Sequence, residues 1–205
     1  MKTVAVVPAY DEEDRIGDVV KEVSGFVDRV FVVDDGSTDG TMEYARGAGA
    51  EVLTHGENRG YLEALKTGFQ NVDADVFVTL DADGEMNPRY IPDLLEPIIG
   101  GEADLVMGAR RDIPRFSEKI LNSIAGLKTD ISDTGTGYRA IRASLAKEME
   151  LRGVCPCGSF VLEAVDLGAD IVEVPVMNRG VEKPRGVAWK HFIQFFYILK
   201  MLIFG

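Results

Sequence analysis

Apolar and polar residues along the chain follow two alternating patterns. Short apolar runs rich in valine end at proline, glycine or acidic residues, which is typical of buried β-strands. Between these runs, apolar residues recur at the spacing of helices that pack one face on a core. This alternation predicts an α/β fold in which parallel strands are joined by helical crossovers. The predicted strands are residues 3–8, 29–34, 51–55, 75–81, 104–108 and 170–176, and the predicted helices are residues 14–24, 39–48, 60–71, 90–99, 116–127, 142–150 and 159–167.

An acidic turn follows the fourth predicted strand. The apolar run at residues 76–80 ends at Asp81, Ala82 and Asp83, and Glu85 follows one glycine later. In open α/β sheets, ligands bind at the carboxyl ends of the strands. Carboxylates this close repel one another unless a cation lies between them, and hard oxygen ligands suit Mg²⁺ or Mn²⁺ held together with substrate phosphates. The segment therefore predicts a divalent-metal site, with a solvated acidic turn as the alternative.

The first two predicted strands also end in polar turns. The strand at residues 3–8 ends at a proline. It is followed by residues 9–13, three of which are acidic, and a helix begins there. The strand at residues 29–34 runs into a glycine-containing turn that includes Asp35. Parallel strands joined by helices place their carboxyl ends at one edge of the sheet. Together with the acidic turn, these segments predict one ligand-binding edge; the alternative for the second turn is a loop that only caps a helix.

Taken in order, these segments resemble those of family 2 glycosyltransferases, especially the dolichyl- and polyprenyl-phosphate sugar synthases. The resemblance covers nearly the whole chain and implies the GT-A fold, with a Rossmann-like, mostly parallel sheet flanked by helices. It implies a nucleotide-binding half at residues 1–108 and an acceptor half at residues 109–178 of a single domain, in line with 205 residues of 46% hydrophobic composition. The matching segments are residues 8–13 (PAYDEE), 33–41 (VDDGSTDGT), 58–60 (NRG), 80–84 (LDADG), 108–110 (GAR), 133–139 (DTGTGYR) and 173–176 (EVPV).

The resemblance implies a nucleoside diphosphate sugar as the donor. Asp35 would accept hydrogen bonds from the base, and Tyr10 would contact it with its ring; packing is the alternative for Tyr10. A carboxylate can pair with the ring N–H of uracil or with the guanine edge, so UDP and GDP donors both stay open. The residues implied for nucleotide binding are Pro8, Ala9, Tyr10, Glu12, Val33, Asp35, Asp81 and Ala82.

The resemblance also assigns roles in the acidic turn. Asp83 would bind Mg²⁺ or Mn²⁺ directly, and Asp81 would lie nearer the sugar, the ribose or a metal-bound water. Glu85 stands where the family often has glutamine, and it would be a third carboxylate ligand or an exposed turn residue. A metal here stabilises the negative charge that grows on the leaving diphosphate. The family transfers the sugar with inversion at the anomeric carbon.

The chemistry of the acceptor decides whether the enzyme needs a base. A hydroxyl acceptor must lose a proton to a positioned carboxylate, and Asp133 and Glu163 are the candidates. A lipid monophosphate, with a second pKa of about 6, is already an anion at neutral pH and needs cations instead. Arg110 and Arg139 match arginines that the synthases use for phosphate, which the arginine fork grips with two bonds. The predicted catalytic residues are Asp83, Arg110, Arg139 and Asp133.

Charge and cysteine content narrow the possibilities. The net charge is −12, which argues against nucleic acid as a partner. Cys155 and Cys157 flank a proline, and with histidine only at positions 55 and 191 they give no zinc signature, so we expect reduced loop residues. The N-terminus has no signal-peptide pattern, which favours a cytoplasmic chain.

The segment at residues 179–205 differs from the rest, because it holds five basic residues against one acidic residue and many large apolar ones. Its apolar stretches are too short to span a bilayer, which takes about 20 residues. Trp189, Lys190, Tyr197 and Lys200 are typical of the membrane interface. The segment predicts an amphipathic helix lying on the cytoplasmic face of a membrane. The alternative is a helix docked on the core or in a homodimer interface.

The sequence as a whole predicts an inverting, metal-dependent glycosyltransferase acting on a polyprenyl or dolichyl phosphate. Two alternatives stay open. The same fold could transfer sugar to a saccharide or protein hydroxyl, or the chain could be a nucleotide-sugar-binding subunit without turnover. The intact pair Asp81 and Asp83 argues against the second alternative.

Overall fold

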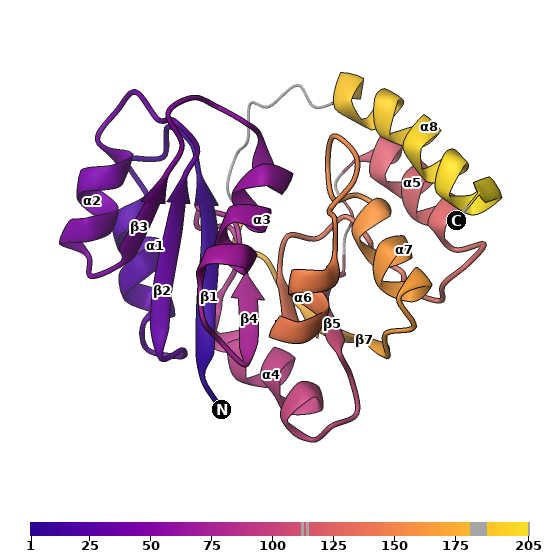
Figure 1. The fold of residues 1–205 in the computed structure, drawn as a ribbon, viewed down its shortest axis with the longest axis horizontal. Coiled ribbons are helices and arrows are strands. Elements are labelled where there is room, and N and C mark those ends of the chain that lie inside the picture. Colours follow the sequence, from indigo (N-terminus) through magenta and orange to yellow (C-terminus); the bar gives the residue numbers. More distant parts are fainter. Residues whose placement is uncertain (112, 114, 181–187, 205) are drawn as a thin grey trace.

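The computed structural model describes residues 1–111, 113, 115–180 and 188–204, without the side chains of residues 188–190 and 204. In these parts of the chain seven strands form one sheet in the order β3-β2-β1-β4-β6-β5-β7 (Figure 1). Strand β6 runs antiparallel to both of its neighbours, and all other pairs are parallel. The strands are β1 (Thr3–Ala9), β2 (Arg29–Asp34), β3 (Glu51–Thr54), β4 (Val76–Thr79), β5 (Leu105–Arg110), β6 (Arg139–Arg142) and β7 (Ile171–Val176).

Helices cover both faces of the sheet. Helices α1, α2 and α4 supply the core on one face, and α3, α6 and α7 supply it on the other. A third, smaller core lies where α5, α7 and α8 meet. The helices are α1 (Ile16–Val23), α2 (Thr41–Gly47), α3 (Tyr61–Asn71), α4 (Ile91–Ile99), α5 (Phe116–Ala125), α6 (Ala143–Glu148), α7 (Ser159–Asp166) and α8 (Ala188–Phe204), with a 3₁₀ turn η1 (Pro88–Tyr90) before α4. The predicted α/β class is confirmed.

The central strand β1 shows why the apolar runs in the sequence are continuous. Successive side chains of a strand point to opposite faces of the sheet. Ala5 and Val7 face one core, whereas Val4 and Val6 face the other, and all four are fully buried. A strand covered by helices on both faces needs apolar residues at every position.

Strand β6 is the element that the sequence did not predict. Its four residues are Arg139, Ala140, Ile141 and Arg142, so the strand has no apolar run and carries a charge at each end. It nevertheless lies inside the sheet, where it pairs with β4 on one side and β5 on the other. Its position depends on pairing with strands far away in the sequence, which a local pattern does not record.

Helix α8 packs against α5 and α7 at the edge of the molecule (Figure 1). Gln194 and Ile198 on its inner face are fully buried, whereas Phe192, Phe196 and Ile203 are more than half exposed. The helix is therefore docked along one side and open along the other. Within the described residues, the structure contains no helix with both the length and the apolar character needed to cross a bilayer.

Candidate active site

The carboxyl ends of β1, β2 and β4 open into a cavity of about 320 Å³. Its walls come from both halves of the chain. Its lining residues are Pro8, Ala9, Tyr10, Glu12, Asp35, Asn58, Gly60, Tyr61, Ala64, Asp81, Ala82, Asp83, Glu85 and Met86 from the first half, and Arg110, Arg115, Glu118, Gly135, Gly137, Val154, Cys155, Pro156, Cys157, Asn178 and His191 from the second. We call this cavity the central pocket.

The structure brings all but one of the predicted nucleotide-binding residues to the central pocket. The exception is Val33, which is fully buried in the core on β2 and does not line the cavity. Val33 pairs in the sheet with Pro8, which does line it. Val33 can therefore support the pocket wall from behind, whereas direct contact with a nucleotide stays a prediction.

Asp35 is held in place by a network of hydrogen bonds. Its carboxylate accepts bonds from the backbone N–H groups of Arg59 (2.9 Å) and Gly60 (2.7 Å). It also lies 2.6 Å from Nδ1 of the buried His55, whose Nε2 lies 2.9 Å from Oγ1 of Thr67. These contacts fix the direction in which the carboxylate meets the pocket. The sequence analysis missed the role of His55, because nothing in the local sequence joins it to Asp35.

The acidic turn after β4 places its carboxylates along one wall of the central pocket. Asp83 is 6% exposed, and its Oδ1 accepts the backbone N–H of Glu85 at 3.0 Å. The left-handed backbone of Gly84, with φ of +73°, makes this tight turn possible. A Cβ at Gly137 would lie only 2.6 Å from Oδ1 of Asp81, so the carboxylate lies against a bare stretch of backbone from the other half of the chain.

The carboxylate oxygens of this turn are of the kind that Mg²⁺ and Mn²⁺ prefer. Asp81, Asp83 and Glu85 line the same pocket, so the donor set fits a hard divalent ion. The three carboxylates are not clustered as tightly as a preformed metal site. Among the described residues, the only three side chains with ligand atoms within 4.8 Å of one another are Cys155, Cys157 and His191. An ion at the acidic turn would therefore take several of its ligands from diphosphate oxygens or water.

Tyr61 lies behind the acidic turn at the start of α3. Burial, together with the neighbouring Asp81 carboxylate, raises the pKa of Tyr61 above its ordinary value, although the charge of Arg139 works in the opposite direction. The phenol therefore stays neutral. The Asp81 carboxylate and the Arg139 guanidinium both lie close enough to Tyr61 for their charges to act on its phenol.

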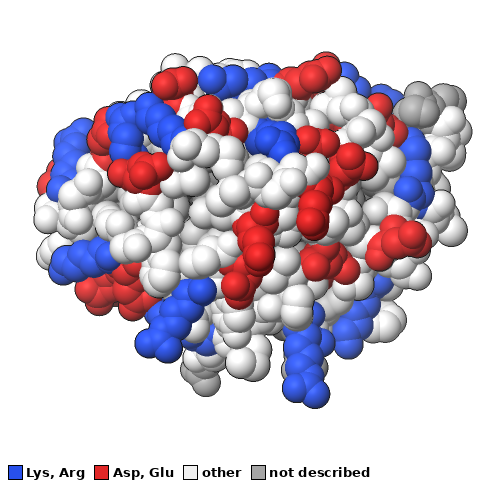
Figure 2. Space-filling view, turned by 90° about the horizontal axis from the view of Figure 1, so that it is seen from below, with Lys and Arg blue, Asp and Glu red and all other residues white. Residues whose placement is uncertain are grey.

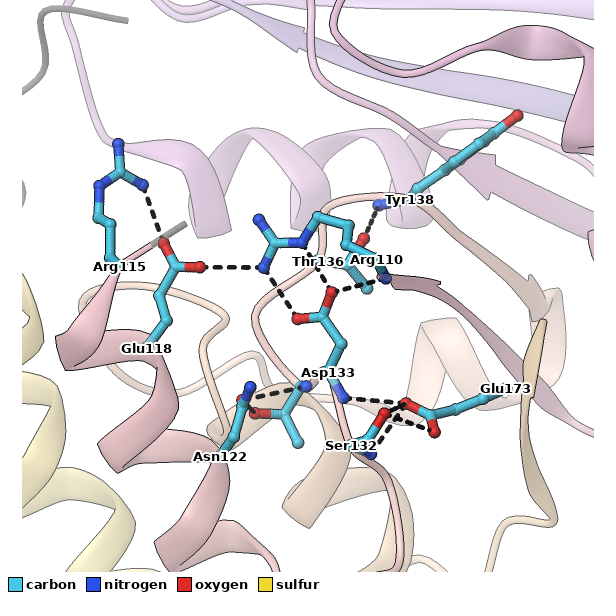
Figure 3. A network of polar contacts seen from close by, with 10 residues as sticks. Arg110, Arg115, Glu118, Asn122, Ser132, Asp133, Thr136, Tyr138 and Glu173 are labelled. Carbon is cyan, nitrogen blue, oxygen red and sulfur yellow. Dashed lines mark hydrogen bonds and ion pairs between the residues drawn. The ribbon is translucent and has the colours of Figure 1, made fainter. Parts of the chain in front are cut away.

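Two arginines and two acids form a chain of ion pairs, three members of which line the central pocket (Figure 3). Arg110 donates from Nε (2.7 Å) and Nη2 (2.8 Å) to the two oxygens of Asp133. Its Nη2 also donates to Glu118 (3.0 Å), which accepts a second bond from Arg115 (2.8 Å). Burial disfavours the charged guanidinium, but the bonds and charges of Asp133 and Glu118 outweigh it and raise the pKa of Arg110. The charge on Arg110 is therefore permanent.

Neither predicted base reaches the central pocket. Asp133 is fully buried, and Arg110 occupies both of its oxygens. Glu163 lines a separate cavity of about 280 Å³ beside α8, where it accepts backbone N–H bonds from Glu150 and from Leu151 (3.1 Å). These contacts engage both carboxylates, and a role for either one as a base stays a prediction.

The two predicted phosphate-binding arginines differ in position. Arg110 lines the central pocket, whereas Arg139 is fully buried on β6 and does not. The guanidinium carbon of Arg139 lies 4.3 Å from the centre of the Phe160 ring, a cation–π contact. Contact between Arg139 and an acceptor would require its side chain to leave this position, and it stays a prediction. Arg115, which the sequence analysis missed, lines the pocket in its place.

Comparison with known proteins identifies the class. The family model described as glycosyl transferase family 2 matches residues 4–154. This match covers well over half of the chain, so the protein belongs to glycosyl transferase family 2 and is a glycosyltransferase, as the sequence predicted.

Its relatives include enzymes named for lipid phosphates. The chain is 31% identical to an undecaprenyl-phosphate mannosyltransferase of Micrococcus luteus, over 86% of this chain and 83% of the relative. It is 32% identical to a dolichyl-phosphate hexose transferase of Haloferax volcanii, over 85% of this chain and 81% of the relative. A dolichol-phosphate mannosyltransferase of Pyrococcus furiosus is 28% identical over 97% of this chain but only 64% of its own length. The predicted resemblance to the polyprenyl-phosphate sugar synthases is confirmed.

Solved structures confirm the predicted GT-A fold. A glucosyl-3-phosphoglycerate synthase of M. tuberculosis has a TM-score of 0.80 and 25% sequence identity, with 97% of this chain and 79% of that chain covered. The same enzyme in complex with Mn²⁺, UDP-glucose and glycerol 3-phosphate also has a TM-score of 0.80 over the same shares, at 23% identity.

Proposed function

We propose that the protein is an inverting, divalent-metal-dependent enzyme that transfers a hexose from a nucleoside diphosphate sugar to a polyprenyl phosphate. One observation carries this proposal. A single pocket joins an acidic turn suited to a hard divalent ion with the guanidinium groups of Arg110 and Arg115, while both predicted bases lie outside it. The names of the relatives from Micrococcus luteus, Haloferax volcanii and Pyrococcus furiosus support a lipid phosphate as acceptor.

The donor nucleotide would lie along the ends of β1 and β2. Pro8, Ala9 and Tyr10 form one wall, and the oriented carboxylate of Asp35 would accept hydrogen bonds from the base. The complex of the structural neighbour with UDP-glucose supports a nucleoside diphosphate sugar. A carboxylate can accept hydrogen bonds from uracil and from guanine, so the transfer assay below compares UDP- and GDP-sugars.

Asp83, with Asp81 and Glu85 beside it, would hold Mg²⁺ or Mn²⁺. Such an ion supplies Lewis-acid stabilisation to the diphosphate as it leaves. The Mn²⁺ in the complexes of the structural neighbour supports a divalent ion. The pocket residues themselves keep the carboxylates in place: Gly84 sets the turn, and Gly137 leaves room for Asp81.

The acceptor phosphate would meet Arg110 and Arg115. One of its oxygens attacks the anomeric carbon from the face opposite the diphosphate; the new oxygen–carbon bond forms as the bond to the diphosphate oxygen breaks. The attacking oxygen is already anionic above a pH of about 6, so no proton has to be removed. The acceptor would compete with Glu118 for the arginine forks, and Arg115, with 34% of its side chain exposed, is the more accessible of the two.

We further propose that α8 brings the enzyme to a membrane surface. Its outer face exposes Phe192, Phe196 and Tyr197, and Lys200 is exposed as well, which is the composition of an interfacial helix. Trp189 and Lys190 were part of this prediction, but their side chains lie outside the described residues, as do Lys183 and Arg185. Arg179 forms an ion pair with Glu22 (2.7 Å). Peripheral contact on the cytoplasmic side and homodimerisation are both proposals for this face.

The acidic balance of the chain argues against nucleic acid as a partner. On the face seen from below, acidic and basic side chains are interspersed and do not gather into a basic stripe (Figure 2). A phosphate backbone is bound by such a stripe. The net charge of −12 acts in the same direction.

The test is a transfer assay with a matrix of donors and acceptors. UDP- and GDP-sugars are each offered with a short-chain polyprenyl phosphate and with the corresponding polyprenol, in Mg²⁺, in Mn²⁺ and in chelator. We expect transfer to the phosphate alone, loss of transfer in chelator, and a rate that rises with pH to about 6 and then stays level. Transfer to the polyprenol or to a saccharide, with a pH profile that needs a base near neutrality, would show a hydroxyl acceptor. Nucleotide-sugar binding without transfer would indicate a binding subunit.

A further inference from the structure

A second cluster of metal-binding side chains lines the central pocket. Cys155 and Cys157 come from the loop before α7, and His191 comes from α8. Each offers one ligand atom, and the three atoms lie within 4.8 Å of one another. The sequence predicted reduced cysteines in a loop, and neither forms a disulfide in the structure. The fold also sets His191, 34 residues after Cys157, beside them.

The distances suit a tetrahedral ion. Sγ of Cys157 lies 3.7 Å from Nε2 of His191. A sulfur and a nitrogen bound to one tetrahedral Zn²⁺, at about 2.3 and 2.1 Å, are separated by about 3.6 Å. Thiolate and imidazole are the ligands that zinc prefers, whereas the carboxylates of the acidic turn suit Mg²⁺ or Mn²⁺. The two groups of side chains therefore favour different metals.

A hydrogen bond to the other ring nitrogen, Nδ1, orients the imidazole of His191. Nδ1 of His191 lies 2.7 Å from Oγ of Ser117 on α5. With the Nδ1 proton donated to that hydroxyl, the lone pair of Nε2 points toward Cys157. Metal-binding histidines in proteins commonly have such a partner on the other ring nitrogen, which fixes the tautomer and the orientation of the ring.

Residues around the loop are adapted to bring it against α8. The side chain of Gln194, one turn after His191, is fully buried. Its oxygen accepts the backbone N–H of Val154 (3.0 Å), and its amide nitrogen donates to the carbonyl of Cys157 (3.1 Å) and to Ser159 (2.7 Å). These three hydrogen bonds fix the position of the loop relative to α8.

Glycines at both ends of the loop allow this approach. A Cβ at Gly153 would lie 2.7 Å from the side-chain oxygen of Gln194, and a Cβ at Gly158 would lie 2.4 Å from Cδ1 of Ile198. Both glycines also have a left-handed backbone, with φ of +115° and +77°. Other residues at these positions would strain the left-handed backbone and displace the side chains of Gln194 and Ile198, which pack the loop against α8.

We propose that Cys155, Cys157 and His191 bind one Zn²⁺ ion, separate from the hard divalent ion of the acidic turn. All three residues line the central pocket, so the fourth coordination position faces the cavity and takes water or an anionic oxygen. The ion ties α8 to the loop and closes the end of the pocket. This site does not depend on the identity of the sugar or of its acceptor.

Cobalt provides a direct test on the full-length, reduced protein after removal of metals. Co²⁺ bound to thiolates in a tetrahedral site gives sulfur-to-cobalt charge-transfer absorption that carboxylate sites do not give. We expect one equivalent of Co²⁺ to produce this band and one equivalent of Zn²⁺ to remove it. Cys155 and Cys157 are the only cysteines in the chain, so a thiol reagent should count two thiols without zinc and none, or slowed reaction, with zinc.

Variants locate the ion. Cys157→Ser and His191→Gln should each lose the Co²⁺ band or shift it and should weaken Zn²⁺ affinity by about 10- to 100-fold or more. The matched control is Asp83→Asn, which removes a carboxylate from the acidic turn and should leave the band unchanged. Circular dichroism reports whether each variant is folded, and the wild-type spectrum and thiol count stand on their own if one is not.

Three results would overturn the proposal. Absence of charge-transfer absorption in the wild-type protein would exclude a thiolate-bound metal. A band that survives His191→Gln would remove the histidine from the site, and loss of Mn²⁺-dependent nucleotide binding in that same variant would assign His191 to the acidic turn instead. Rapid oxidation to a Cys155–Cys157 disulfide with no protection by zinc would make the pair a redox couple. None of these results bears on sugar transfer, so the proposed function is tested separately.

Discussion

The two ends of the central pocket are built in different ways. The side of the pocket proposed to bind the donor, here called the donor end, consists of strand ends and tight turns, so each of its carboxylates follows directly on the apolar run that positions it. The side proposed to bind the acceptor, here called the acceptor end, consists of side chains from β5, α5, the loop before α7 and α8, which meet only through packing of distant elements. The donor end is therefore defined by local sequence, and the acceptor end by tertiary structure. Substitutions at the two ends should therefore differ in their effects on activity, ligand binding and stability.

The largest effect is expected at the donor end. Asp83→Asn removes a charge from the acidic turn and should lower kcat/KM by about 10³-fold or more, because a bound metal contributes several kcal/mol to stabilising the leaving group. Calorimetry should show loss of metal-dependent nucleotide binding at unchanged circular dichroism. The control is Asp73→Asn, an aspartate whose side chain is 88% exposed. Near-wild-type turnover of Asp83→Asn in Mg²⁺ or Mn²⁺ would remove this residue from the metal site.

At the acceptor end, Arg110→Ala should affect both activity and stability. It leaves the buried Asp133 without its partner, which costs about 3–5 kcal/mol and lowers Tm, and it should reduce transfer by about 10²-fold or more. Arg115→Ala leaves Glu118 paired with Arg110, so it should reduce transfer with little change in Tm. Thermal unfolding and steady-state kinetics on both variants separate the two roles. Unchanged transfer by Arg115→Ala would argue against phosphate binding at this wall.

Recognition of the base should appear in KM. Asp35→Ala removes charged hydrogen bonds that act in the ground state and should raise KM for the nucleotide sugar by about 10- to 100-fold with little change in kcat. His55→Gln keeps the carboxylate but loses part of its support, so the same change in KM should be smaller, about threefold to tenfold. Equal effects of the two variants would mean that Asp35 acts only through folding, and an unchanged nucleotide affinity in Asp35→Ala would contradict its assignment.

The smallest effect is expected on the outer face of α8. Phe192→Ser combined with Phe196→Ser should weaken binding to vesicles of anionic lipid by about tenfold and should leave transfer to a short-chain soluble acceptor unchanged. Deletion of α8 is a poorer test, because Ile198 and Gln194 on its inner face belong to the core. Phe26→Ser, at an exposed position between α1 and β2, is the control. If the double variant instead becomes monomeric in sedimentation and binds vesicles normally, this face is a homodimer interface.

This contrast also explains how much the sequence could predict. Apolar runs and the turns that end them located six of the seven strands among the described residues, and they placed Asp81, Asp83 and Asp35 on one edge. The missed strand, β6, has charged ends and no apolar run. The burial of Arg139 could not be predicted, because the elements that cover a strand residue come from distant parts of the sequence. For the same reason, Arg115, His55 and the group of Cys155 and His191 escaped notice.

Strand β6 has a mechanical consequence. Through its backbone it bonds to β4, which carries the acidic turn, and to β5, which carries Arg110. The acidic turn and Arg110 are therefore carried by one continuous hydrogen-bonded sheet and cannot swing about a hinge between them without breaking it. Any closure around bound ligands has to come from the elements outside this sheet, and the spacing between the acidic turn and Arg110 is set before any ligand arrives.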